Sequence, residues 1–261
     1  MPAPPCPLAL LTDPQQPGPW QRQLAHALAI PLVEAPDAAT LLLRFTPTGL
    51  ELGKPGDRHL PGGLRVDFAG TDVRRRLLHP GRELLVQAAK VRHTALPLLI
   101  DATAGLGRDG FLLAAAGFRV RMIECNPVVA ALLADGLERA RHIPELAHPA
   151  ERIHLIAGNA LDDLAALAEQ PDVIYLDPMF PERTKSALVK QELRLLQLLD
   201  HKTGDPADLL TAALAVHAKK VVVKRPLKGP PLAALVPSYT LRGKAIRFDV
   251  YVGTGRRETP G

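Results

Sequence analysis

From residue 79 onward, short apolar runs typical of buried strands alternate with longer amphipathic stretches typical of helices. We expect helices over residues 82–91, 108–117, 127–141, 161–169, 184–199 and 206–217. The strands between them are expected at LPLLIDAT, RVRMIE, RIHLIAG, DVIYLDP and KVVVKRP, and a closing pair, SYTLRG and AIRFDVYVG, adds an antiparallel edge. This alternation implies right-handed β-α-β units, and therefore an α/β fold whose mostly parallel sheet is covered by helices on both faces.

The first 78 residues follow a different pattern and predict a small, β-rich α+β module. A strand is expected at residues 8–12 and a short helix at residues 20–28. The stretch TLLLRFTPTGLELG predicts two strands joined by a Pro-Thr-Gly turn, and LRVDFAG predicts a further strand. We therefore divide the chain into a module over residues 1–78 and a main domain over residues 79–261.

The composition of the chain is that of a globular protein and argues against several other classes. The chain has 261 residues, 47% apolar and 23% charged, which is ordinary for a globular protein and argues against a disordered or fibrous chain. No apolar run approaches the ~18 residues that a membrane-spanning helix needs. The N-terminal stretch MPAPPCPLAL lacks the basic region and the unbroken apolar run of a signal peptide, so we expect a cytoplasmic protein with no membrane partner.

Nucleophiles and metal ligands are sparse in the sequence. The two cysteines, Cys6 and Cys125, are too few for a disulfide framework or for a zinc site built from thiolates, and the nine histidines are scattered. Neither of the two serines, Ser186 and Ser238, lies in a G-x-S-x-G turn, which argues against acyl transfer. We expect neither a metal nor a covalent intermediate.

The net charge of the chain indicates what kind of partner it binds. A formal charge of +5 and an isoelectric point near 9.4 favour an acidic partner. The cations cluster at residues 74–76, 219–228 and 242–247. Such clustering favours a nucleic acid, and the alternative is that these residues are solvated surface faces.

A glycine-rich loop follows the first predicted strand of the main domain. Gly105 and Gly107 belong to a G-x-G-x-x-G spacing, which lets a backbone turn tightly beside a ligand, as in NAD-binding folds. Asp101 ends the preceding strand, and a carboxylate there suits the cationic S-adenosylmethionine better than it suits a pyrophosphate. Glu124, at the end of the next strand, is placed to accept both ribose hydroxyls of either cofactor. Asn159 follows the third strand, either to meet the adenine edge or as a simple turn residue.

The fourth strand of the main domain ends in Asp-Pro-Met-Phe-Pro, at residues 177–181. This segment resembles the (D/N)-P-P-(F/Y) motif of methyltransferases that modify exocyclic amino groups, with Met179 in place of the second proline. The carboxylate of Asp177 and the carbonyl of Pro178 can accept the two N–H groups of a conjugated amine and stabilise the positive charge that develops on its nitrogen. Phe180 offers a face on which a base can stack. The alternative is a proline-bounded turn with a buried phenylalanine.

Six stretches of the sequence together resemble one bacterial family. They are residues 101–109, 124–133, 175–181, 185–190, 221–226 and 247–251. They look like the small-subunit ribosomal RNA guanine-N2 methyltransferases, which modify a guanosine near the 3′ end of 16S rRNA, and the similarity spans about residues 74–254. It implies a class I methyltransferase with a Rossmann-like, mostly parallel seven-stranded sheet. It further implies S-adenosylmethionine as donor, and N2-methylguanosine in the 16S rRNA of the small ribosomal subunit as product.

The resemblance also implies cofactor contacts. It places the cofactor at Arg108, Asp109, Glu124, Cys125, Asn159, Ala160 and Asp177. The pair at 159 and 160 departs from the small hydroxyl residues expected in the family, so the contacts to adenine there differ from the family pattern.

Six cations are the candidates for contacts with RNA. They are Arg75, Arg76, Lys185, Lys190, Lys224 and Arg225. The arginines at 75 and 76 lie in the expected link between module and domain, where they can clamp an RNA backbone. Lys224 and Arg225 lie at the ligand edge of the sheet, where they can neutralise phosphates, and a surface or capping role is the alternative for each.

Three other functions remain open on the sequence. The first is an NAD-dependent dehydrogenase that uses the same glycine loop. The second is another nucleic-acid amino-methyltransferase, acting on adenine N6 or on a different guanine N2. The third is a non-enzymatic RNA-binding factor for ribosome assembly. The sequence does not indicate an oligomeric state.

Overall fold

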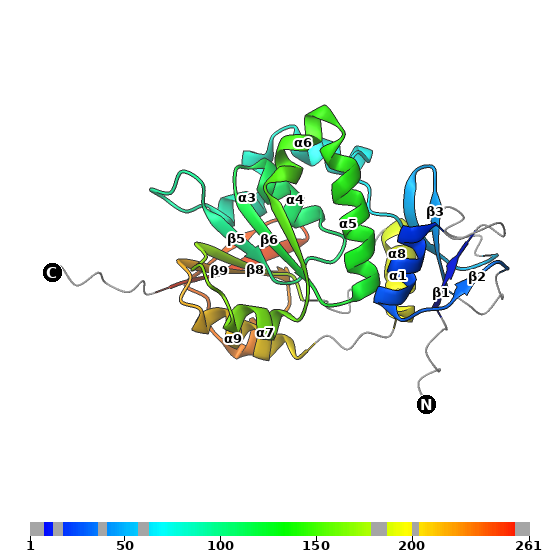
Figure 1. The fold of residues 1–261 in the computed structure, drawn as a ribbon. Helices are drawn as coiled ribbons and strands as arrows, with labels where there is room; N and C mark the ends of the chain where they lie inside the picture. The colour runs from blue at the N-terminus through cyan, green and yellow to red at the C-terminus, as the bar shows by residue number, and fades with distance from the viewer. Residues whose placement is uncertain are drawn as a thin grey trace.

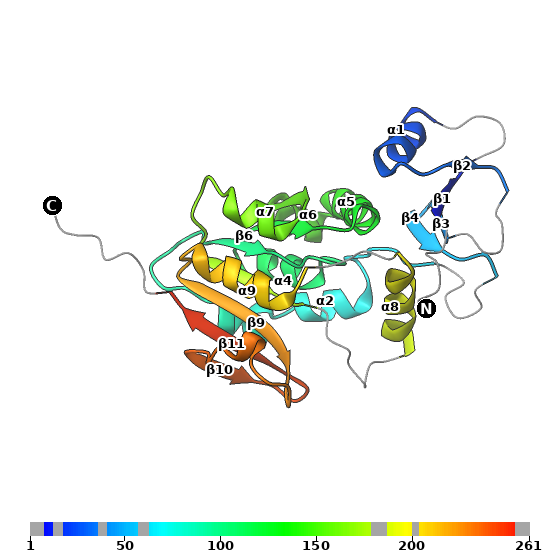
Figure 2. The same ribbon diagram turned by 90° about the horizontal axis from the view of Figure 1, so that it is seen from below.

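The computed structural model describes residues 8–12, 18–35, 41–56, 63–178, 187–199 and 204–253, which form two sheets and their flanking helices. Figures 1 and 2 show the larger sheet with its helices as the main body of the molecule. The smaller, N-terminal sheet lies to one side, next to helix α5 (Pro127–Arg141). The division into a β-rich module over residues 1–78 and a domain over residues 79–261 stays a prediction.

The larger sheet has seven strands in the order β10-β11-β9-β8-β5-β6-β7. These are β5 (Leu98–Asp101), β6 (Arg119–Glu124), β7 (Ile153–Ala157), β8 (Val173–Leu176), β9 (Lys220–Pro226), β10 (Tyr239–Arg242) and β11 (Ile246–Val252). Strands β5 to β9 pair in parallel, and β11 pairs antiparallel with both β9 and β10, as the sequence predicts. The chain runs outward from β5 to β7 and then returns to β8 on the other side of β5. Ligands of such sheets bind where the strand order reverses, beyond the carboxyl ends of β5 and β8.

Helices cover both faces of this sheet, and the alternating side chains of the strands separate two cores. One core contains Leu99 and Val222 together with helices α3 (Leu84–Ala89), α4 (Arg108–Ala115), α5 and α6 (Pro144–Glu151). The other contains Ile100 and Val221, which pack against α7 (Ala160–Ala165) and α9 (Pro206–Ala215). Figure 1 shows α3 to α6 above the sheet and α7 and α9 below it. Helix α8 (Ala187–Leu198) completes the set of expected helices.

Two helices were not expected from the sequence, and one expected strand is wrong. Residues 74–76, predicted as part of a link, lie in helix α2 (Thr71–Leu77), and α6 forms in spite of the proline at its sixth position. The segment LRVDFAG contributes only an isolated bridge at Leu64. Its apolar residues Val66 and Phe68 are buried against helices instead of pairing with a strand; the ring of Phe68 stacks on Phe111 at 4.1 Å.

The smaller sheet has the order β2-β1-β3-β4. Its strands are β1 (Leu8–Leu11), β2 (Leu32–Val33), β3 (Leu41–Thr46) and β4 (Gly49–Gly53), and helix α1 (Pro19–Leu28) follows β1. Strand β1 pairs in parallel with β2 and β3, whereas β3 and β4 form the expected hairpin.

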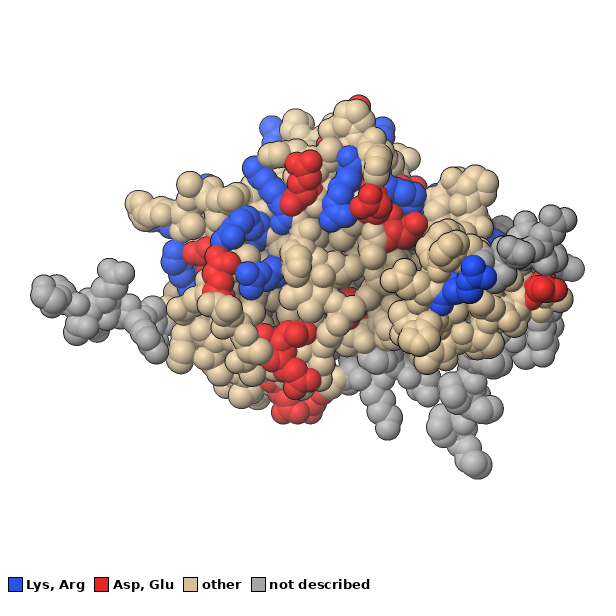
Figure 3. Space-filling model, in the orientation of Figure 1, with Lys and Arg blue, Asp and Glu red and all other residues tan. Residues whose placement is uncertain are grey.

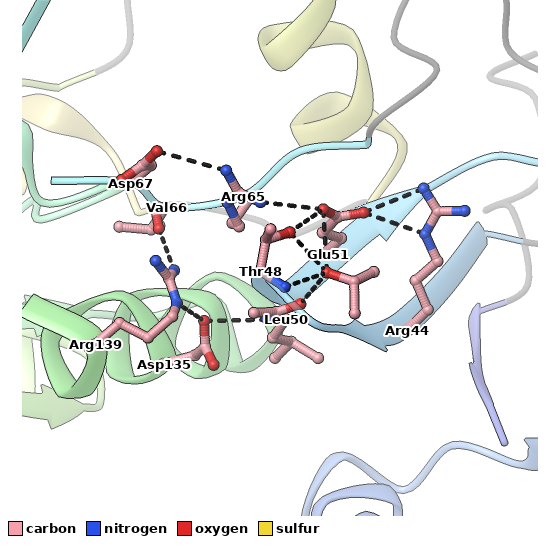
Figure 4. A network of polar contacts seen from close by, with 11 residues as sticks. Arg44, Thr48, Leu50, Glu51, Arg65, Val66, Asp67, Asp135 and Arg139 are labelled. Carbon is pink, nitrogen blue, oxygen red and sulfur yellow. Dashed lines mark hydrogen bonds and ion pairs between the residues drawn. The ribbon is translucent and has the colours of Figure 1, made fainter. Parts of the chain in front are cut away.

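Polar contacts connect this hairpin to helix α5 (Figure 4). The carboxylate of Asp135 on α5 accepts the backbone N–H of Leu50 at 3.1 Å and pairs with Arg139 Nε at 2.9 Å. Arg139 also donates to the carbonyl of Val66. One α5 carboxylate therefore holds both the hairpin and the arginine that binds the segment leading into the main domain.

The surface in Figure 3 mixes both signs of charge, with lysine and arginine interspersed among acidic residues over the upper part of this face. Elsewhere in the described chain, basic residues are also neutralised locally: Arg119 and Arg121 both pair with Glu169, and Lys219 pairs with Asp172. Among the helices in the described part of the chain, none combines the length and apolarity that crossing a bilayer requires.

Replacing Asp135 by alanine should lower the free energy of unfolding by about 1–3 kcal/mol, because the Leu50 N–H and the Arg139 guanidinium lose their shared acceptor in a partly buried contact. The measurement is urea denaturation followed by circular dichroism. Glu138→Ala, three residues further along the same helix, is the matched control. Its ion pair with Arg141 is exposed, and we expect a change within about 0.5 kcal/mol. Equal losses in the two variants would contradict the role of Asp135.

Candidate active site

The glycine loop lies between β5 and α4, and its two glycines have different tasks. Both have positive φ, +54° at Gly105 and +73° at Gly107, a conformation that side chains disfavour. A Cβ on Gly107 would lie 2.5 Å from Leu133 Cδ1, so this glycine permits the loop to pack on the core. A Cβ on Gly105 would have its nearest neighbour, Thr103 O, at 3.9 Å. Gly105 is therefore the position that leaves room for a ligand.

Glu124 connects this loop to the end of β6. Its Oε2 accepts the N–H of Gly105 at 2.7 Å, and its Oε1 accepts the N–H of Asn126 at 2.8 Å. The Cys125 thiol also lies 3.9 Å from Oε1, and the contact of this carboxylate with ribose hydroxyls stays a prediction. The neighbouring thiol of Cys125 is half-buried, and burial followed by the charge of Glu124 raises its pKa.

Asp101 is the most deeply buried acid of the site. Its side chain is 1% exposed at the end of β5, and its Oδ1 accepts the N–H of Thr103 at 3.2 Å. Burial, together with the nearby carboxylates Asp109, Asp177 and Glu124, raises the pKa of Asp101 to about 8, although the hydrogen bond from Thr103 opposes the shift. An edge of the sheet that is this rich in acids suits the cationic S-adenosylmethionine better than it suits the pyrophosphate of NAD.

A lysine joins two of these acids. Lys224 Nζ, on β9, lies 2.8 Å from Asp109 Oδ2 on α4 and 2.8 Å from Asp177 Oδ2, directly after β8. Burial opposes the charged ammonium, but the two carboxylates outweigh it and raise the pKa of Lys224. The Arg76 guanidinium pairs with Asp109 Oδ1 at 2.9 Å, and the hydroxyl of Tyr175 donates to Asp109 Oδ2 at 2.7 Å.

The same contacts decide how Asp109 and Tyr175 titrate. Burial alone would raise the pKa of Asp109, yet Lys224 and Arg76 hold it far below its usual value. Burial and the charge of Asp109 raise the pKa of Tyr175 well above its usual value, so its hydroxyl remains a donor. The sequence analysis did not single out Tyr175; its place as an inward-facing residue of β8, two before Asp177, is the signal that could have found it.

Asp177 borders the glycine-loop strand. Its backbone N–H donates to Thr103 Oγ1 at 2.6 Å, and its side chain is 38% exposed. Pro178 is buried directly after it. Met179 and Phe180 lie outside the described residues, so the predicted stacking face of Phe180 stays a prediction.

The remaining predicted cofactor residues lie at helix starts. Asn159 caps α7, with its Oδ1 accepting the N–H of Leu161 at 3.1 Å, and Ala160 is buried behind it. This contact is the turn role that the sequence left open, and a contact of the Asn159 amide with adenine stays a prediction. Arg108 opens α4 and pairs with the buried Glu192 of α8 at 2.6 Å.

The six predicted RNA-binding cations occupy different environments. Arg75 is exposed on α2 and pairs with Asp72, whereas Arg76 and Lys224 belong to the network around Asp109. Arg225 is 5% exposed and donates to the carbonyl of Pro230, because alternation along β9 turns it to the opposite face from Lys224. Lys185, and the side chain of Lys190, lie outside the described residues. Contacts of all six with RNA stay predictions.

A seven-stranded sheet of this order, with a glycine loop after β5 and an acid at the end of β6, defines a class I S-adenosylmethionine-dependent methyltransferase. The predicted fold class is confirmed. A family model for SAM-dependent methyltransferases matches residues 24–253. The crystal structure of a SAM-dependent methyltransferase from Neisseria gonorrhoeae is 36% identical, with a TM-score of 0.74 over 95% of this chain and 96% of that one. The chain belongs to this family of enzymes, and its cofactor is S-adenosylmethionine.

Curated relatives narrow the family. The protein named ribosomal RNA small subunit methyltransferase J from Thioalkalivibrio sulfidiphilus is 46% identical over 88% of this chain and 91% of its own length. Proteins of the same name are 47% identical in Aeromonas salmonicida, over 90% of this chain and 94% of that protein, and 45% identical in Pseudomonas aeruginosa PAO1, over 88% of each. The chain belongs to the family of these proteins, and the predicted resemblance is confirmed.

The raised pKa of Asp101 should make cofactor binding depend on pH. Below pH 8 this carboxyl is mostly protonated, and only its ionised form attracts a cation, so affinity should rise with pH by up to about tenfold per unit and level off above pH 8. Calorimetric titration with S-adenosylmethionine at pH 6 to 9 measures this dependence.

Asp101→Asn should remove the part of the pH dependence of cofactor affinity that comes from titration of the Asp101 carboxyl. The α-amino group of the ligand titrates alike with both proteins and cancels in the difference between them. Asp72→Asn, on the exposed surface of α2, is the control and should behave as the wild type does. If the curves of the wild type and of Asp101→Asn run parallel, Asp101 does not contact the charged part of the ligand.

Proposed function

We propose that this enzyme transfers a methyl group from S-adenosylmethionine to the exocyclic N2 amino group of a guanosine in the 16S rRNA of the small ribosomal subunit. One observation carries the proposal. The N–H of Asp177 bonds to Thr103 Oγ1 at 2.6 Å, and this bond holds an amine-accepting carboxylate beside the start of the cofactor loop. The names of the relatives support the choice of RNA substrate.

Asp101 and Glu124 end β5 and β6, and Gly105 and Asn159 follow β5 and β7, so these four residues lie at the carboxyl edge of the sheet, where we place the cofactor. When bound, S-adenosylmethionine supplies an electrophilic methyl group on a sulfonium. The ammonium and sulfonium charges match the acids of the site, and we assign the ribose hydroxyls to the carboxylate of Glu124. This arrangement supports these residues as the cofactor contacts.

The amino group of guanine is a weak nucleophile because its lone pair is delocalised into the ring. Asp177 and the carbonyl of Pro178 accept its two N–H groups, which turns the lone pair toward the methyl carbon and stabilises the charge developing on nitrogen. Lys224 holds the Asp177 carboxylate in place at 2.8 Å. The product ammonium is acidic enough to lose its proton to Asp177 or to water. Positioning supplies the rest of the acceleration.

The rival functions fit the site less well. A dehydrogenase would have to place a pyrophosphate among four acids. An assembly factor that only binds RNA would have no use for the Asp177–Thr103 bond or for a buried Asp101. Methylation of adenine N6 uses the same Asp-Pro motif, so it is the alternative that the experiment must separate. We therefore propose a cytoplasmic enzyme that methylates ribosomal RNA, and the experiment below tests its activity on that RNA.

Asp177→Ala should lower the rate of methyl transfer by about 10²–10³-fold, because one preorganised partner of the developing charge is lost. The assay measures transfer of tritium from labelled S-adenosylmethionine to small-subunit rRNA that lacks the modification. Nucleoside mass spectrometry of the product identifies the base, and N2-methylguanosine is expected.

Asp208→Ala, at an exposed position in the first turn of α9, is the control and should keep wild-type activity. Equal labelling by Asp177→Ala and the wild type would remove Asp177 from the mechanism. N6-methyladenosine in the digest would instead show that the methylated base is adenine and not guanine.

A further inference from the structure

A cleft of about 340 Å³ lies next to the charged network. Its apolar walls come from Leu84 and Leu85 at the start of α3 and from Ile246 and Phe248 on β11. Ligand pockets usually measure about 300–1,000 Å³, so this cleft has the size for one nucleobase or nucleoside and not for a dinucleotide. Apolar side chains from two elements, α3 and β11, suit contact with a planar ring.

The charges of the cleft argue against a phosphate. Arg76 and Lys224 line it, but Arg76 already pairs with Glu83 and Asp109, and Lys224 pairs with Asp109 and Asp177. Glu83 and Asp109, which line the cleft, and Asp177 beside it therefore already neutralise these two cations, so an anion would find no uncompensated positive charge on the lining residues. A neutral ring that presents both hydrogen-bond donors and acceptors fits these groups better.

Lys224 connects the cleft to the proposed site of methyl transfer. Its side chain is 25% exposed, lines the cleft and reaches Asp177 Oδ2 at 2.8 Å. A lysine ammonium has three N–H donors, and within the described residues Asp109 and Asp177 take two of them. The third is available to an acceptor on a ligand in the cleft.

We infer that the cleft binds the target guanine, an inference that rests on the proposed function. In this arrangement Lys224 donates a hydrogen bond to guanine O6, and Asp177 accepts one from the N2 amino group. Guanine carries these two groups on one edge, an acceptor at C6 and donors at C2. Lys224 and Asp177 present the complementary pair at adjacent positions. Adenine has an amino group at C6, which would place a donor against the ammonium. Lys224 is thus a residue that determines specificity, in addition to holding Asp177.

The test replaces the target guanine by 2,6-diaminopurine, which keeps the C2 amino group and has an amino group in place of O6. A synthetic segment carrying either base at the methylated position is ligated into small-subunit rRNA, and kcat/KM is measured for both RNAs. The wild type should prefer guanine by about 10- to 100-fold, the discrimination that one well-placed polar contact gives. Lys224→Met should bring the ratio close to one.

Three comparisons keep the test decisive. Lys224→Gln has an amide that can accept from the C6 amino group, so the ratio should fall in this variant even if the methionine variant folds poorly. Lys219→Met, at an exposed position before β9, is the matched control and should keep the wild-type ratio. Binding of S-adenosylhomocysteine by calorimetry verifies that each variant is folded.

The outcomes separate the two proposals. In one outcome the wild type labels guanine RNA while both Lys224 variants lose activity equally on the two RNAs, which leaves the ratio of kcat/KM unchanged. Lys224 then only positions Asp177, so the inference about guanine O6 is overturned and the proposed function stands. A wild-type ratio near one overturns it as well. If the wild type labels no guanine RNA, the proposed function fails and the inference fails with it.

Discussion

The Lys224 ammonium between Asp109 and Asp177 is the interaction on which the site depends. Four acids lie at this edge of the sheet: Asp101 and Glu124 end strands, Asp177 follows one, and Asp109 lies in the first turn of α4. Unscreened carboxylates this close repel one another, and burial would protonate them. Lys224, with Arg76 on the far side of Asp109, keeps Asp109 ionised and Asp177 in a fixed position. Since losing one partner of a buried pair costs more than the pair contributes, this network constrains the whole edge of the sheet.

The reversal of strand order explains how two functions meet at one place. Strand β5 leads into the cofactor loop and its neighbour β8 leads into the Asp-Pro segment, because the chain returns across β5 after forming β7. The Thr103–Asp177 hydrogen bond joins the two strand ends directly. A cofactor on the β6 side and a base on the β9 side would then meet at this bond. The cleft between α3 and β11 continues on the β9 side.

The parts of the protein that local patterns could predict are those with strong periodicity or a distinctive motif. The parallel strands, the antiparallel edge and the glycine loop were all predicted from residues that are neighbours in the sequence. The strand expected near Val66 failed because burial alone does not distinguish pairing with a strand from packing against a helix. Helix α6 was missed because prolines at its first and sixth positions resemble a loop, although a proline costs little in the first turn.

The sequence by itself predicted the class of the fold from the alternation of strands and helices after residue 79, the cofactor from the family resemblance, and the carboxylate at residue 177 from a short contiguous motif. The tertiary structure alone decided the partners of these groups. Lys224 meets Asp109 across 115 positions of the chain, and Arg76 meets it across 33. It also separated Lys224 from Arg225, two adjacent cations with the same predicted role, because successive side chains of a strand face opposite sides of the sheet. Such pairings depend on how elements pack, which no local pattern encodes.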